Sequence, residues 1–295
     1  MFTEAEQPQM KKLSPEVESF FDPATNTVTH CVMDPGSRAC AVVDPVLDYD
    51  PKSGKTNTES ADAVIAYIKE HDRQLEWPLE THVHADHITA APYIKAKLGG
   101  RIGIGRRISE VQDTWNDIFN YKEGTRTDVE VFDHLFEDGE TFHIGGLEAR
   151  VIFTPGHTNV DVTYLIGDSA FVGDTLFMPD YGTARADFPG GDARQLYRSI
   201  HRILSLPDDT RLYMCHDYLP KGRKEHRWVT SVGEEKKNIH IHGVSEDKFV
   251  EMRQAKDKRL DTPTLLYPSL QMNIRGGHKP PAEDNGISYI KIPVK

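Results

Sequence analysis

The stretch His82-Val83-His84-Ala85-Asp86-His87 places three imidazoles and one carboxylate within six residues. It follows a predicted strand that ends near position 81, and it precedes a helix that apolar spacing predicts over residues 88–98. In an extended backbone alternate side chains point the same way, so His82 and His84 can converge on one point while Asp86 and His87 face a neighbouring one. Burying several imidazoles without a metal or matched partners would be costly. The stretch therefore predicts a metal site rather than a solvated histidine loop.

Three more candidate ligands follow predicted strands later in the chain. They are His157 after the Pro-Gly corner at 155–156, Asp174 after the glycine at 173, and His216 after an apolar strand. Each is weak evidence alone, because a lone Asp at a strand end usually caps a turn. Four strand ends that each offer an imidazole or a carboxylate are explained more simply as one site.

The order of predicted elements indicates a layered α/β domain with helices outside two sheets. Predicted strands cover residues 27–33, 39–43, 101–104, 141–144, 147–153, 162–166, 170–172 and 211–215. Besides 88–98, predicted helices cover residues 60–70 behind a Ser cap, 193–206, and about 246–258. We expect a flexible N-terminal tail at 1–15, a main domain at 16–220, and a C-terminal extension at 221–295 that packs on the core.

The composition argues against several classes of protein. Among 295 residues, 46 Asp and Glu stand against 35 Lys and Arg, giving a formal net charge of −11 without a long basic run, so nucleic acid is not an expected partner. The chain lacks an apolar run of the roughly 18 residues that a membrane span needs, and its first residues lack the apolar stretch of a signal peptide. Three cysteines form no disulfide framework. We therefore expect a cytoplasmic protein without membrane contact.

The order His-x-His-x-Asp-His, Pro-Gly-His, Gly-Asp-Thr and a late His resembles the metallo-β-lactamase superfamily. These motifs run through about 135 residues, from position 82 to position 216. The resemblance implies an αββα sandwich that holds metal at one edge of its sheets, with residues 16–220 as the catalytic domain. Membership of the superfamily leaves the reaction open.

A finer resemblance is to the persulfide dioxygenases, also called sulfur dioxygenases or ETHE1-like proteins. It is carried by residues 81–89, by Arg185-Ala186-Asp187-Phe188 and by His216-Asp217-Tyr218, and the tail resembles the bacterial subgroup of β-lactamase-like hydrolases. It implies a single Fe(II) held by His82, His157 and Asp174. Such a two-His-one-carboxylate face leaves positions open for O₂ and a persulfide sulfur, with sulfite and a thiol as products and no protein nucleophile.

The remaining motif residues allow two interpretations. In the dioxygenases, the positions of His84, Asp86, His87 and His216 hold the iron ligands and waters by hydrogen bonds. The same four residues can instead complete a two-zinc site with Asp174 as the bridge, as in a hydrolase of thioesters (glyoxalase II-like) or lactams. Imidazole and carboxylate suit both metals, so the residue types alone do not decide.

Arg185 and Tyr218 match the positions that contact glutathione in the dioxygenase family. The alternative is that Arg185 pairs with Asp187 or Asp180 and that Tyr218 only packs. The loop reads Gly-Thr-Ala-Arg-Ala-Asp at 182–187, whereas the mitochondrial type usually has Gly-Cys-Gly-Arg-Thr-Asp, which leaves the thiol carrier open between glutathione and a related small thiol. Related enzymes are often dimers, so the expected partners are a small persulfide, O₂ and a second copy of the chain.

Overall fold

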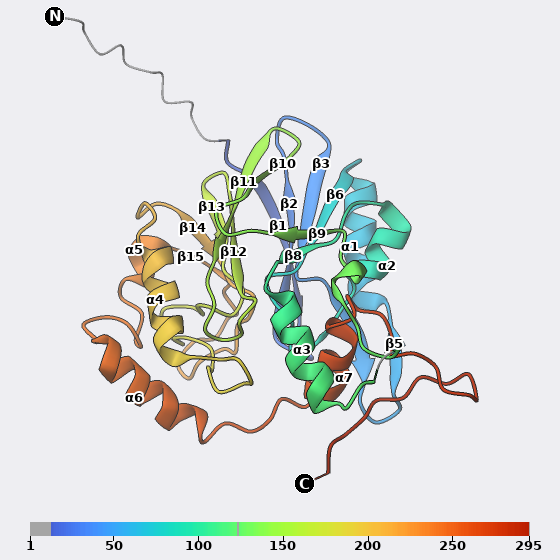
Figure 1. The fold of residues 1–295 in the computed structure, drawn as a ribbon. Helices are drawn as coiled ribbons and strands as arrows, with labels where there is room; N and C mark the ends of the chain where they lie inside the picture. Colours follow the sequence, from blue (N-terminus) through green and yellow to red (C-terminus); the bar gives the residue numbers. More distant parts are fainter. Residues whose placement is uncertain (1–12, 123, 295) are drawn as a thin grey trace, which may run out of the picture.

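Two six-stranded sheets face each other in the computed structural model, which describes residues 13–122 and 124–294 (Figure 1). The expected tail at 1–15 lies almost entirely outside these residues. The first sheet runs β1 (Glu16–Asp22), β2 (Thr27–Met33), β3 (Ala39–Val43), β6 (Gln74–Leu79), β8 (Gly103–Gly105) and β9 (His134–Phe136). The second runs β10 (Thr141–Ile144), β11 (Leu147–Phe153), β12 (Val162–Ile166), β13 (Ser169–Phe171), β14 (Arg211–Tyr213) and β15 (Val229–Ser231).

The central core lies between the two sheets, because their strands direct alternate apolar side chains inward. Val32 and Leu79 from the first sheet pack in one cluster with Val151 and Tyr164 from the second, and all four side chains are fully buried. This core fixes the strands whose ends carry the candidate ligands.

Helices cover the outer faces of both sheets (Figure 1). Ile68 of α1 (Glu59–Glu70) and Ile94 of α2 (Ala91–Leu98) pack on β2 and β3. On the second sheet, Leu196 of α4 (Ala193–Leu204) packs with α5 (Val232–Glu235) and with Phe249 of α6 (Glu246–Asp257). A further cluster joins α3 (Ile108–Ile118) to α7 (Leu266–Asn273). The arrangement is the expected αββα sandwich, and none of the helices in the described residues is long and apolar enough to span a bilayer.

The structure corrects the start of two predicted helices. The helix expected from residue 88 begins at Ala91, because Ile88–Thr89 forms strand β7 against β4 (Val46–Asp50), which also pairs with β5 (Lys55–Asn57). Pro92 suits the first turn of α2, where an amide hydrogen has no helical partner. In α1 the N-cap residue is Thr58 and not a serine, since the hydroxyl of Ser60 instead donates to Asp48 (2.6 Å).

Most other predicted bounds agree with the structure within one or two residues. The strands predicted at 27–33, 39–43, 141–144, 147–153 and 162–166 are confirmed without change. Ten of the described elements had no sequence prediction: the strands β1, β4, β5, β7, β9 and β15, the helices α3, α5 and α7, and the 3₁₀ turn η1 (Val129–Val131). A signal for α3 is present, because Ile108, Val111 and Trp115 recur on one helical face and are buried.

Candidate metal centre

The four ligand-bearing segments meet where their strands end. Residues 82–87 follow β6 without forming a helix or strand of their own, and the other three segments follow β11, β13 and β14. His82, His157 and Asp174 are all buried, and one ligand atom of each lies within 4.8 Å of the others. The distance from Asp174 Oδ2 is 3.5 Å to His157 Nε2 and 3.9 Å to His82 Nε2. The structure therefore brings these three residues together.

Several buried atoms in and beside this cluster have no hydrogen-bond partner among the described residues. They include His82 Nε2 and Asp174 Oδ1, and the nearby His87 Nε2 and His216 Nε2 are in the same state. A buried polar atom without a partner costs about 1–3 kcal/mol, and several in one place are rare in a folded protein. A bound cation would satisfy them together, so the donor set fits a metal ion.

Hydrogen bonds on the far side of two imidazoles select the tautomer that binds metal. His157 Nδ1–H donates to the carbonyl oxygen of Arg185 (2.7 Å), which leaves the Nε2 lone pair facing Asp174. His82 Nδ1 lies 3.0 Å from the hydroxyl of Thr81, so its Nε2 also faces inward. Burial lowers the pKa of His82 well below its ordinary value, with the rings of His84 and His157 adding to the effect, which keeps the imidazole neutral as metal binding requires.

The other motif residues form two neighbouring groups, one of which shares Asp174 with the first. His84, Asp86 and His87 offer ligand atoms within 4.8 Å of one another, and so do Asp174, Cys215 and His216. His216 Nε2 lies 3.3 Å from Asp174 Oδ1 and 3.4 Å from Asp86 Oδ2. Burial alone would lower the pKa of His216, but these two carboxylates outweigh it and raise the pKa above its ordinary value.

His84 is engaged by two buried carboxylates that the sequence analysis missed. Its Nε2 lies 3.0 Å from Asp44 Oδ1 and 3.3 Å from Glu80 Oε2. Burial alone would lower the pKa of His84, but attraction to and hydrogen bonding with Asp44 and Glu80 outweigh it and raise the pKa well above its ordinary value. In the described residues, no cluster of candidate ligands joins His84 to His82 and His157.

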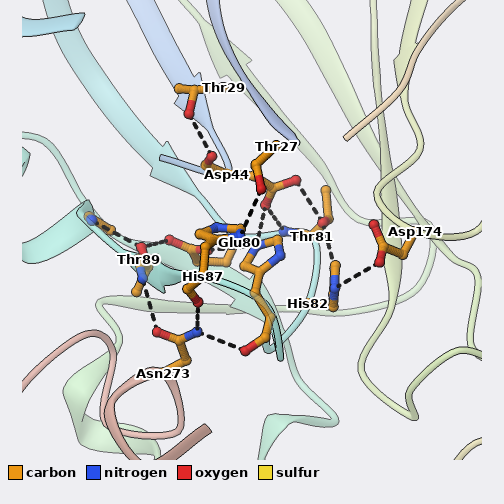
Figure 2. Close-up of polar contacts among 12 residues, drawn as sticks. Thr27, Thr29, Asp44, Glu80, Thr81, His82, His87, Thr89, Asp174 and Asn273 are labelled. Atoms are coloured by element: carbon orange, nitrogen blue, oxygen red, sulfur yellow. Dashed lines mark hydrogen bonds and ion pairs between the residues drawn. The ribbon is translucent and has the colours of Figure 1, made fainter. Parts of the chain in front are cut away.

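Asp44 also fixes the entry of the metal-binding segment (Figure 2). Its carboxylate accepts both the backbone N–H and the hydroxyl of Thr81, each at 2.8 Å. Its own backbone is left-handed (φ 51°), a conformation in which Asp is among the few tolerated residues. The sequence signal for this role is an Asp directly before a proline at a strand end, which by itself indicates only that the strand stops.

Asn273 of α7 holds the same segment from the other side (Figure 2). Its amide group donates to the carbonyl oxygens of His84 (2.9 Å) and His87 (2.8 Å), and its own oxygen accepts the N–H of Thr89 (2.9 Å). Only the fold reveals this contact, because Asn273 is 186 residues from His87 in the sequence.

Arg185 follows the alternative interpretation from the sequence, although it does lie beside the centre. Its guanidinium makes a double ion pair with Asp187 (2.7 and 3.0 Å), while Asp180 pairs with Arg223 instead. Tyr218 stacks on the ring of His216 (5.3 Å between centroids). Both Arg185 and Tyr218 line a cavity of about 1130 Å³ that also reaches His157 and Asp174.

Comparison with known proteins assigns the family. The family model of the metallo-beta-lactamase superfamily matches residues 31–216. The chain belongs to this superfamily. It is 53% identical to the "Probable metallo-hydrolase" of Burkholderia pseudomallei over 94% of this chain and 98% of that protein, and 46% identical to "Glyoxylase B2" of Dictyostelium discoideum over 95% and 97%.

More distant members of the superfamily carry the name of the expected reaction. The chain is 29% identical to "Persulfide dioxygenase ETHE1, mitochondrial" of Homo sapiens over 90% of each chain. The crystal structure of ETHE1 from Myxococcus xanthus superposes with a TM-score of 0.71 at 30% identity, covering 89% of this chain and 100% of that one. The His and Asp clusters thus form a metal-binding site of the metallo-β-lactamase fold that opens on a cavity large enough for a small organic substrate.

Proposed function

We propose that this chain is an Fe(II)-dependent persulfide dioxygenase with one iron per chain. The reaction would be RSSH + O₂ + H₂O → RSH + sulfite + 2 H⁺, with glutathione persulfide or a related small persulfide as RSSH. The observation that carries the proposal is that His82, His157 and Asp174 form one compact group of candidate ligands, whereas no such group in the described residues joins His84 to His82 and His157. Two imidazoles and one carboxylate on one side of a cavity are the donor set of non-haem Fe(II) oxygenases.

Iron bound there would supply the electrons that activate O₂, and its open positions would take O₂ and sulfur. The chain's own residues would provide binding and orientation. Tyr218 lines the cavity, and burial, followed by the charges of Asp174 and Asp86, raises the pKa of its hydroxyl well above the ordinary value. The hydroxyl therefore stays protonated and can donate a hydrogen bond to a persulfide anion.

A two-zinc hydrolase is the second candidate, because Asp86, His87 and His216 lie beside Asp174 and several relatives carry hydrolase names. In that enzyme Asp174 would bridge the metals, and a bound water would attack a thioester such as S-lactoylglutathione. The two candidates differ in metal content and in their need for O₂.

The test is metal analysis of protein purified without oxygen, together with oxygen-electrode assays on glutathione persulfide. One iron per chain and persulfide-dependent O₂ uptake are expected, and both should be lost in His157→Ala and Asp174→Ala. His201→Ala, an exposed histidine on α4, serves as the control. Two zinc ions per chain, turnover of S-lactoylglutathione and no O₂ uptake after iron loading would refute the proposal.

A further inference from the structure

The C-terminal extension forms part of the wall of the cavity beside the metal centre. Helix α6 and the segment after it contribute Arg253, Lys256, Arg259 and Leu260 to the lining. The cavity therefore carries a group of cations that is separate from Arg185.

Arg185 is engaged by contacts within the chain. Its Nε and Nη2 both donate to the carboxylate of Asp187, and Nη1 donates to the carbonyl oxygen of Asp261 (2.8 Å). The ion pair also neutralises its charge. Arg253 is in the same condition, because it pairs with Asp257 (2.7 Å) and donates to the carbonyl oxygen of Thr183 (2.9 Å).

Lys256 and Arg259 are the cations of this group that have no carboxylate partner in the described residues. No salt bridge within 4 Å joins either of them to a carboxylate in the residues that the structure describes, whereas the neighbouring cation Arg253 is fully paired. Both side chains are exposed to the cavity side of the extension, and Lys258 between them does not line the cavity. A guanidinium and an amine at one wall provide donors for a carboxylate.

His240 holds the amine of Lys256 at the cavity wall. The backbone N–H of Thr183 donates to His240 Nδ1 (3.1 Å), so the ring proton is on Nε2, which lies 2.5 Å from Lys256 Nζ. An amine can accept this N–H only in its neutral form. Burial, with Arg253 adding to it and Asp257 opposing it, lowers the pKa of Lys256, which agrees with this arrangement. An incoming carboxylate would favour the ammonium form, so its binding would take up a proton.

We propose that Lys256 and Arg259 form the subsite that binds a carboxylate of the persulfide's organic carrier, and so make the enzyme selective for carboxylate-bearing thiols. This inference rests on the proposed persulfide dioxygenase function. It assigns substrate selection to the C-terminal extension and not to Arg185.

The first experiment compares two substrates on the iron-loaded full chain: glutathione persulfide, which has carboxylates, and 2-hydroxyethyl persulfide, which has none. In Lys256→Met/Arg259→Met, KM for glutathione persulfide should rise about tenfold while kcat stays the same. KM for 2-hydroxyethyl persulfide should not change. Lys258→Met is the matched control and should behave as wild type with both substrates. An unchanged KM for glutathione persulfide, or an equal rise for both substrates, would overturn the subsite.

The second experiment separates failure of the subsite from failure of the proposed reaction. Binding of S-methylglutathione, which cannot be oxidised as a persulfide, is measured by titration calorimetry in buffers of different ionisation enthalpy. The double variant should bind about tenfold more weakly and lose the proton uptake that accompanies binding to wild type. If wild type consumes no O₂ but the two proteins differ in this way, the reaction is wrong and the subsite stands. Equal affinities of the two proteins for S-methylglutathione, or no binding to wild type, would refute the proposed subsite.

Discussion

Replacing Asn273 by Ala would test whether the C-terminal helix supports the metal centre. The side chain is buried, and its three hydrogen bonds reach the backbone of residues 84, 87 and 89 at 2.8–2.9 Å. At about 1–1.5 kcal/mol for each bond, the loss predicts a destabilisation of about 3–5 kcal/mol. Two carbonyl groups of the metal-binding segment would also lose their donor, which should lower metal affinity by about 10- to 100-fold.

Gln271→Ala is the matched control on the same helix. Gln271 is also buried, and its side chain bonds Tyr121, Tyr267 and Lys291 at 2.8–2.9 Å, none of which belongs to the metal-binding segment. It should therefore lose similar stability while keeping its metal affinity.

Two measurements on the same preparations distinguish the variants. Urea unfolding of metal-free protein gives the free energy of unfolding, and competition with a chelator gives the metal dissociation constant, both against wild type. The expected result is that both variants are destabilised and only Asn273→Ala binds metal more weakly. Equal metal affinities in the two variants would refute the idea that Asn273 supports the site.

Two further predictions concern a backbone corner and a buried acid. Gly156→Ala should cost about 1–3 kcal/mol and weaken metal binding, because an added Cβ would meet the backbone of Leu196 and displace the histidine that follows. Gly139→Ala is the control, because an added Cβ there meets open space. It should cost about 1 kcal/mol in thermal unfolding and leave metal binding unchanged. Burial raises the pKa of Glu235 to about 8 in the folded chain, so the free energy of unfolding should fall by up to about 1.4 kcal/mol per pH unit as the pH rises from about 4.5 to about 8. In urea titrations Glu235→Gln should remove this slope, and Glu234→Gln, at an exposed position, should keep it. Equal slopes in the two variants would show that Glu235 is ionised in the fold.

The sequence predicted the residues of the metal centre better than the residues that support it. The sequence could identify His157, Asp174 and His216 because each follows a strand. Strand ends at one edge of a sandwich lie close together regardless of the conformation of the loops. Asp44 also follows a strand, but the sequence does not identify its partners, and Asn273 in α7 gives no such signal. Asp44 is 37 residues from its partner Thr81 in the sequence, and Asn273 is 186 residues from its partner His87. Hydrophobic periodicity carries no information about side-chain hydrogen bonds over such distances.

These supporting residues set the geometry of the metal-binding segment. The six-residue motif offers its ligands to either arrangement, and the segment that carries it has no helix or strand of its own to fix it. Its geometry is imposed from outside, by Asp44 and Glu80 on His84 and by Asn273 on the backbone. These carboxylates contact Nε2 of His84, and Nδ1 of the same ring has no hydrogen-bond partner in the described residues, so they fix the orientation of the ring without deciding whether it contacts a metal. The contacts around the motif therefore set its geometry, and the motif alone does not specify the number of metals or the reaction.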